Sequence, residues 1–380
     1  MVPPGFIRSV SYTHLDVYKR QMEIRRLDKG DTEKAKKLYA EAFPEDPDKF
    51  RDWYFEKAFS ENDAWGAFDG TCLLSMASVA HYKGCIRNKL CSANFLQSVA
   101  TRKDAGGRGL ASAIIRQILN ALSEEGEGYS SLNTYIHGFY ERLGYTPYTY
   151  RQRKTAEAAV GTGFHLCRYE DADDALVSQM SRLYKKAVEG RHGWRLRSHE
   201  DIQRLLYEYL YLGDAVLICT ENESGMTGYA IAEEKGESLE AAEAIWTDTS
   251  AMDSFAAAAA HMGKQKFAYE ENAEVGEPGR MMRIVNMSSA MGSLALGDGE
   301  CVIWVRDEII RQNNGAWHIF SRDGRTKATK TVADAGVEVS INDMTRLIMG
   351  VNVELNGDRN TVKMVQKVFS PMKCVNFELY

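Results

Sequence analysis

The spacing of apolar residues predicts alternating helices and strands from Met22 to about residue 154. Apolar positions recur at helical spacing behind Asp31, which can cap a helix that ends at Pro44. A second amphipathic segment covers 50–59, and strand-like runs then flank Asp69-Gly70, a hairpin turn signal. The predicted order is helix, helix, hairpin, strand, glycine-rich turn, helix, strand, short helix and strand.

Hairpin strands followed by a helix recur in the middle of the chain. Ser198 and Asp201 form a capping-box pattern ahead of an amphipathic helix. Strand-like runs at 215–220, 228–233 and 239–246 then precede an alanine-rich helix at 252–262. The remainder shows strand patterns at 301–305, 317–321 and 337–341 and a helix at 343–350 that ends at glycine. We therefore expect an α+β fold with units at 22–155, 156–285 and 286–380.

Composition limits the function classes. A length of 380 residues favours two or three domains, and a net charge of −6 argues against a nucleic-acid surface. The sequence has no apolar run of the roughly 18 residues that a membrane span needs. The seven cysteines form no CxxC pair and the eight histidines do not accompany them at ligand spacing, which predicts a cytoplasmic protein with reduced thiols and no metal.

Residues 1–21 read differently from the rest of the chain. They have no apolar core of a secretory signal, and 11–21 looks like a translated vector or assembly junction. Met22 looks like a natural start that leads into the first strand. We therefore expect 1–21 to be a disordered leader outside the fold.

The most informative segment for chemistry runs from Val99 to Ile115. An apolar strand end is followed by Gly106, Gly107 and Gly109 and then by a helix with an apolar face. A glycine-rich turn exposes backbone N–H groups, and a helix start adds partial positive charge. Together they favour binding of a pyrophosphate or a similar anion, although a strand-to-helix turn also needs glycines for geometry alone.

This loop and the downstream sequence FYERLGY, which is 139–145, together resemble the GNAT acetyltransferases. The resemblance implies that acetyl-CoA is the acyl donor and that Tyr140 is the general acid. It assigns the pantetheine-pairing strand to Val99, Ala100 and Thr101. It assigns the pyrophosphate loop and first helical turn to Gly106, Gly107, Arg108, Gly109, Leu110, Ala111 and Ser112. The family usually has Arg or Gln where this chain has Gly106, which implies an anion site of backbone amides and Arg108.

The chain from Met22 to Tyr380 resembles one GNAT subgroup, the enhanced-intracellular-survival acetyltransferases. The stretches 140–148, 279–286 and 347–350 carry this resemblance. It implies two GNAT-like mixed-sheet units in tandem followed by a sterol-carrier-protein-like α+β domain. The turn before the second unit's helix, at 247–250, has no glycine, which indicates a degenerate copy without an anion cradle.

The resemblance also implies that the C-terminal carboxylate, here of Tyr380, acts as the general base, with Glu378 as a rival. It further implies a homo-oligomer, a hexamer. The expected function is direct acetyl transfer to a primary amine of a small cationic molecule, such as an aminoglycoside, or of lysine. The alternative is a non-catalytic protein that binds CoA or an apolar ligand through its third unit.

Acidic residues in and around the second helical segment are a further candidate feature. Asp46, Asp48, Glu56 and Glu61 lie in the segment that lines the acceptor side in the resembled family, where they would attract a cationic amine. A solvated helix face is the simpler interpretation of these four carboxylates. His137, three residues before Tyr140, could touch substrate or be structural.

Overall fold

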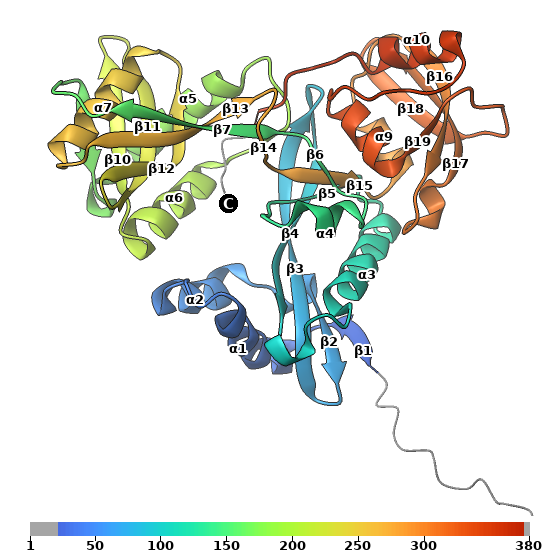
Figure 1. The fold of residues 1–380 in the computed structure, drawn as a ribbon, viewed down its shortest axis with the longest axis horizontal. Coiled ribbons are helices and arrows are strands. Elements are labelled where there is room, and N and C mark those ends of the chain that lie inside the picture. Colours follow the sequence, from blue (N-terminus) through green and yellow to red (C-terminus); the bar gives the residue numbers. More distant parts are fainter. Residues whose placement is uncertain (1–21, 376–380) are drawn as a thin grey trace, which may run out of the picture.

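The computed structural model describes residues 22–375, which form three β-sheets with helices packed on them (Figure 1). The strand-and-helix content confirms the α+β class expected from the sequence. The first sheet has the order β1-β2-β3-β4-β5-β15-β6, with β9 on β3; the second has the order β14-β7-β13-β12-β11-β10-β8; the third has the order β18-β17-β16-β19.

The first sheet and its helices come mainly from the N-terminal third of the described residues. Its strands are β1 (Glu23–Arg26), β2 (Ala64–Asp69), β3 (Cys72–Ile86), β4 (Lys89–Thr101), β5 (Tyr129–Leu132), β6 (Thr146–Pro147), β9 (Trp194–Arg195) and β15 (Met281–Ile284). Its helices are α1 (Thr32–Ala42), α2 (Asp48–Trp53), α3 (Leu110–Glu124) and α4 (His137–Glu141). Short 3-10 turns lie at Lys29–Asp31, Glu61–Asp63 and Lys103–Ala105, and a π-helical turn, η2 (Tyr54–Ala58), extends α2.

The second sheet repeats this arrangement. Its strands are β7 (Tyr150–Glu157), β8 (Phe164–Cys167), β10 (Val216–Asn222), β11 (Gly225–Lys235), β12 (Ser238–Trp246), β13 (Lys266–Ala273) and β14 (Glu277–Pro278). Its helices are α5 (Asp174–Val188), α6 (His199–Leu206) and α7 (Ser250–His261); a 3-10 turn lies at Tyr169–Asp171, and a π-helical turn, η6 (Tyr207–Leu212), extends α6. The strands on either side of α7, β12 and β13, pair in parallel, as do β4 and β5 on either side of α3.

The third sheet forms the C-terminal unit. Its strands are β16 (Gly299–Arg306), β17 (Gly315–Arg322), β18 (Arg325–Lys330) and β19 (Glu338–Ser340). Its helices are α8 (Met287–Gly292), α9 (Ile341–Ile348) and α10 (Arg359–Val368), with a 3-10 turn at Arg311–Asn313. Apolar side chains of these elements, such as Ile303, Met344 and Ile348, are fully buried in one core cluster.

The first two sheets exchange strands. β7 comes directly after β6 of the first sheet in the sequence, but it pairs with β13 of the second sheet. β15 follows the second sheet in the sequence but lies between β5 and β6 of the first. Hydrogen bonds therefore cross the unit boundaries expected at 155 and 285, and those boundaries remain predictions.

One cap differs from its prediction. The Asp31 side chain does not cap α1; it is buried and pairs with the side chains of Arg25 (2.7 Å) and Lys34 (2.8 Å). Asp28 caps the preceding 3-10 turn instead, by accepting from the Gly30 N–H. The Ser198–Asp201 capping box and the hairpin at Asp69-Gly70 are confirmed.

Candidate active site

The strand β4 separates from β5 before it reaches its own end. The two strands pair only at Asn94–Ser130 and Phe95–Ser131. Beyond Phe95, the described strands hydrogen-bond to β4 only along its β3 side. The edge of β4 that leads to Val99–Thr101 is therefore open, and backbone N–H and C=O groups on such an edge need partners. An extended ligand can supply them.

A bulge lies in the same part of β4. On β3, Met76 pairs with Ala100 and Ser78 pairs with Gln97. The two residues Ser98 and Val99 of β4 therefore lie opposite the single residue between Met76 and Ser78. Ser98 has a positive φ of 53°, a strained conformation for a residue with a side chain. Its hydroxyl lies 2.7 Å from the hydroxyl of Tyr54. Bulges of this kind redirect a strand next to a functional site.

The glycine-rich loop connects β4 to α3. Gly107 and Gly109 have positive φ values of 74° and 75°, and no other atom lies within 4 Å of where their Cβ atoms would be. Gly109 is the N-cap of α3, and no side chain caps this helix end. The first N–H groups of α3, from Leu110 to Ser112, thus have no side-chain cap and follow an exposed loop with open space, as an anion site requires.

The cationic group closest in sequence to this loop opening is Arg108, which is exposed and forms no ion pair within residues 22–375. Gly106 is also exposed. By contrast, Arg102 at the start of the loop is already paired with Asp104 through two contacts of 2.6 and 3.0 Å. Backbone amides and Arg108 therefore remain available for a phosphate group.

Tyr140 lies on α4, directly after β5. It is buried, and burial raises the pKa of its hydroxyl to about 12. The ring packs edge-on against Phe139 and Tyr145. Val99 and Leu110 pack in the same core cluster as Tyr140. The structure thus brings the strand end, the helix start and the tyrosine to one region of the first sheet.

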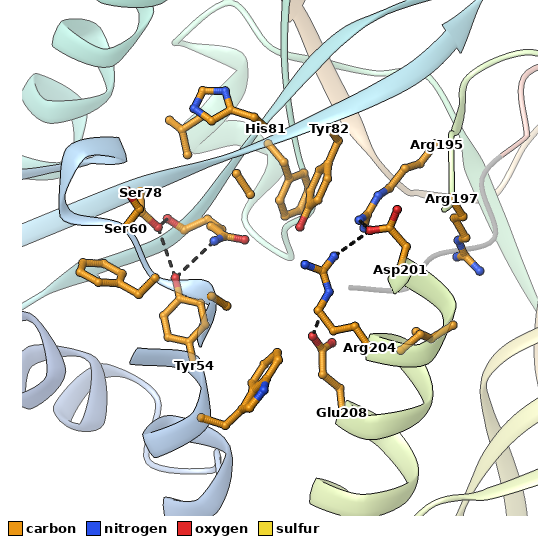
Figure 2. Close-up of a pocket in the computed structure, with 18 of the residues that line it drawn as sticks. Tyr54, Ser60, Ser78, His81, Tyr82, Arg195, Arg197, Asp201, Arg204 and Glu208 are labelled. Carbon is orange, nitrogen blue, oxygen red and sulfur yellow. Dashed lines mark hydrogen bonds and ion pairs between the residues drawn. The ribbon is translucent and has the colours of Figure 1, made fainter. Parts of the chain in front are cut away.

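A cleft of about 410 Å³ lies between the first and second sheets (Figure 2). One wall is α2 with its π-helical turn and contributes Phe50, Trp53 and Tyr54; the opposite wall is α6 with its π-helical turn. The floor comes from β3 and β4, including Phe95 and Gln97. π-Helical turns are rare and occur mostly at functional sites, so their presence on both walls marks this cleft.

Charged side chains concentrate on the α6 wall. The Asp201 carboxylate contacts Arg195 (2.8 Å) and Arg204 (3.1 Å), while its other oxygen caps α6 at Ser198. Arg204 also pairs with Glu208, at 3.5 Å; Figure 2 marks this contact with a dashed line. Burial raises the pKa of Glu208 to about 7, and Arg204 offsets part of this effect. Sequence reasoning missed Glu208, and the pattern at Ser198–Asp201 indicated only a helix cap.

Deeper in the cleft, Arg197 and Glu243 form a buried bidentate pair at 2.7 and 2.5 Å. His81 on the other side contacts Asn94 (2.7 Å) and Asp63 (3.2 Å). Burial acts to lower the pKa of His81, but the hydrogen bond to Asp63 helps to raise it overall. The cleft therefore contains positively and negatively charged side chains opposite an aromatic wall.

The acidic residues expected on the acceptor side do not line this cleft. Asp46 accepts a hydrogen bond from Tyr39, Asp48 pairs with Arg51, and Glu56 pairs with Lys57. Glu61 contacts Thr32. That wall is aromatic because Phe50, Trp53 and Tyr54, and none of these four carboxylates, line the cleft. Tyr140, His137 and the glycine loop also lie outside the cleft lining; β4 connects the two regions.

The predicted base, Tyr380, and its rival Glu378 lie outside the described residues. The last described residue, Val375, is buried in the core of the second sheet, and its N–H donates to the His192 carbonyl at 2.8 Å. The partly buried Trp194, whose neighbour Arg195 lines the cleft, packs against the same cluster. The described chain therefore ends beside the elements that form the cleft.

Comparison with known families identifies two parts of the chain. Residues 23–148 match the family described as acetyltransferase (GNAT) domain, and 288–353 match the sterol carrier protein domain. These two stretches are therefore similar to a GNAT acetyltransferase domain and to a sterol carrier protein domain. No curated protein matches the chain.

Solved structures share the fold over most of the chain. A conserved Enterococcus faecalis protein described as a probable N-acyltransferase superposes with a TM-score of 0.79 at 18% identity, over 95% of this chain and 100% of that one. A GCN5-related N-acetyltransferase from Anabaena variabilis gives 0.78 at 14% identity, over 95% and 100%. Eis1 from Mycobacterium abscessus gives 0.68 at 14% identity, over 94% and 100%. These likenesses support the two mixed sheets and the C-terminal unit as one architecture.

Two absences concern the described residues alone. No helix within 22–375 is long and apolar enough to cross a membrane. No group of three or more His, Cys, Asp or Glu side chains in that range is arranged to hold a metal ion. The metal, location and oligomer expectations stay predictions.

Proposed function

We propose that this protein is an acetyl-CoA-dependent N-acetyltransferase whose first sheet holds the cofactor. The observation that carries the proposal is the open edge of β4, which leads directly into the uncapped N-terminus of α3. This arrangement offers backbone pairing groups for a pantetheine arm and N–H groups for a pyrophosphate. The absence of any atom around the Cβ positions of Gly107 and Gly109 leaves room for such a ligand.

The chain's own residues would divide the chemistry between them. Acetyl-CoA supplies an acetyl group activated as a thioester. Backbone N–H groups of Val99–Thr101 would polarise the carbonyl, and Gly106–Ser112 would hold the pyrophosphate. Tyr140, protonated at neutral pH, would donate its proton to the departing sulfur.

The acceptor amine would enter through the cleft between the sheets. The aromatic α2 wall can pack against its carbon skeleton, and the mixed charges on the α6 wall can orient its polar groups. We propose a primary amine on a small molecule or on lysine. Aromatic and carboxylate groups together are favourable for an ammonium ion.

Three carboxylates are candidates for the base that takes the amine proton. The Tyr380 carboxylate and Glu378 are two of them, and they lie outside the described residues, five and three positions after Val375. Glu208 is a third candidate because it already lines the cleft and its pKa is about 7. We favour Tyr380, as the family resemblance implies.

The test is binding followed by turnover. Acetyl-CoA should raise the melting temperature, because a ligand that binds only the folded state stabilises it. Thiol release should then depend on an added amine from a panel of a polyamine, an aminoglycoside and a lysine peptide. Binding without thiol release for any amine would instead favour the non-catalytic alternative. Complete burial of Ile303, Met344 and Ile348 at the centre of the third unit weighs against an apolar carrier pocket there.

A further inference from the structure

The segment that carries Tyr140 is held in place by residues from distant parts of the sequence. α4 has only five residues, and so short a helix is unstable alone. The carbonyl groups after its last turn lack helical partners and need donors from elsewhere. The structure shows that these donors come from β15 and the C-terminal unit.

Asn342, at the start of α9, supplies the first of these contacts. Its side-chain amide donates to the carbonyl of Glu141 at 3.3 Å and to that of Tyr145 at 2.8 Å. These two carbonyls lie at the two ends of the turn that follows Tyr140. Within this turn, the Tyr140 carbonyl accepts hydrogen bonds from the N–H groups of Leu143 and Tyr145. One side chain of the C-terminal unit thus spans the whole turn.

Arg283 on β15 supplies the second contact. Its guanidinium donates to the Leu143 carbonyl in the same turn. Gly144 has a φ of 84°, and a Cβ there would lie 2.6 Å from Arg283 Nη1 and 3.1 Å from Ile341 Cγ2. The turn therefore packs directly on β15 and α9, with no space for a side chain between them.

The C-terminal unit also fixes Arg283 itself. The guanidinium pairs with Asp307 at 2.6 Å, and both side chains are 1% exposed or less. Asp307 accepts further hydrogen bonds from the Asn313 amide (2.9 Å) and from the N–H groups of Ile309 (2.9 Å) and Ile310 (3.0 Å). A buried charge held by this many donors has one position, and so does its partner.

We infer that the C-terminal unit positions the general acid, with Asn342 and Arg283 as the positioning residues. This inference rests on the proposed role of Tyr140. A hydroxyl that must reach a departing sulfur depends on placement, and a shift of 1 Å can cost about 100-fold in rate. The unit thereby contributes to the catalytic step without touching substrate.

The experiment combines Asn342→Ala with Tyr140→Phe in the full chain. Asn342→Ala should lower kcat by roughly 10-fold or more and leave the KM for acetyl-CoA unchanged. In the Tyr140→Phe background the same change should have no further effect on kcat, because residues that act as a unit are not additive. Asn360→Ala, at an exposed position of α10 in the same unit, is the matched control.

Arg283→Lys is the second variant, since it keeps the buried charge but loses the forked contact to Leu143 and Asp307. It should repeat the pattern of Asn342→Ala, with melting temperature and acetyl-CoA affinity recorded to exclude a folding defect. Equal losses of kcat in the wild-type and Tyr140→Phe backgrounds would overturn the inference, as would no loss in either variant. If Tyr140→Phe itself leaves kcat unchanged, the proposed function fails at its acid and the inference fails with it.

Discussion

At the scale of single residues, burial sets the protonation state of the two side chains that matter most here. Desolvation raises the pKa of Tyr140 to about 12 and that of Glu208 to about 7. The phenol therefore keeps its proton throughout the neutral range. The carboxyl group titrates near neutrality, in a cleft where Arg204 lies 3.5 Å from it.

Tyr140→Phe removes the proposed proton donor and little else. We expect kcat to fall by about 10²–10⁴-fold, the usual contribution of a general acid, with acetyl-CoA affinity unchanged. Steady-state kinetics and calorimetry measure the two quantities. Because the pKa of Tyr140 is about 12, its deprotonation should not lower the kcat of the wild type at any pH up to about 10. A descending limb near pH 8 that disappears in the variant would contradict this pKa.

Glu208→Gln should change the pH dependence of stability. The folded-state pKa of about 7 lies above the ordinary glutamate value, so the native state binds a proton more tightly than the unfolded state. The associated stability is present below about pH 4.5 and is lost as the pH rises through 7. The variant should match the wild type below about pH 4 and exceed it by roughly 3 kcal/mol at pH 8, measured by urea unfolding. Equal stability of the two proteins at both pH values would contradict the shift.

At the scale of elements, the junction of β4, the glycine loop and α3 defines the proposed cofactor site. The strand ends in an open edge, the loop has two glycines in the left-handed region, and the helix begins without a side-chain cap. Each feature alone is common. Their succession along 99–112 is what an extended ligand with a pyrophosphate group requires.

Gly109→Glu places a side chain and a negative charge at the uncapped start of α3. We expect loss of acetyl-CoA binding by calorimetry, because the charge repels the pyrophosphate and the side chain fills its space. Gly126→Glu is the matched control: Gly126 also has a positive φ, of 81°, and open space, but it follows the opposite end of the same helix. Similar affinity in both variants would remove the loop from the site. Arg108→Ala should weaken binding modestly, and more at low salt.

At the scale of the whole molecule, the first two sheets share a plan in which a helix connects two parallel strands. The strands β7 and β15 connect the two sheets, and the cleft lies between their helical walls. In the second sheet the turn before α7 has no glycine, and the Asp248 carboxylate accepts from the Ser250 N–H at 2.9 Å. An acidic side chain thus accepts from the first N–H of α7, and we expect it to disfavour an anion there.

Calorimetric titration should therefore give one acetyl-CoA per chain. The Asp248 carboxylate repels a second pyrophosphate, and α7 has no glycine loop to receive it. Gly109→Glu should abolish all binding if the first sheet holds the single site. Two acetyl-CoA molecules per chain would show that the second sheet is not degenerate. Binding by Gly109→Glu with the same enthalpy as the wild type would show the same.

A short extension after Tyr380 tests the proposed base. We expect folding and acetyl-CoA affinity to persist while kcat falls by about 10²–10⁴-fold, because the terminal carboxylate is displaced. The same extension placed before Met22 is the control. If the C-terminal extension has no effect and Glu378→Gln or Glu208→Gln abolishes turnover, the base is that glutamate. If none of these changes lowers turnover, all three candidate carboxylates are excluded as bases.

The sequence by itself predicted most local elements, because element type depends on the spacing of nearby apolar residues. The helix from Leu110, the strand through Val99 and the capping box at Ser198 all occur as expected. It missed β18 and α10, whose charged residues at 325–330 and 359–368 give a weak apolar signal. The glycine loop was predictable because positive φ values select glycine directly.

Only the tertiary structure decided which strands share a sheet and which side chains share a cleft. β15 could enter the first sheet only through pairing with strands more than a hundred residues earlier, and no local pattern encodes such a partner. The same holds for Glu208, whose pKa depends on burial between two walls, and for the contacts of Asn342 and Arg283 with the turn after Tyr140. Local sequence determines the backbone conformation of each element, whereas burial, charge pairing and the position of the acid arise from contacts that form when distant elements pack.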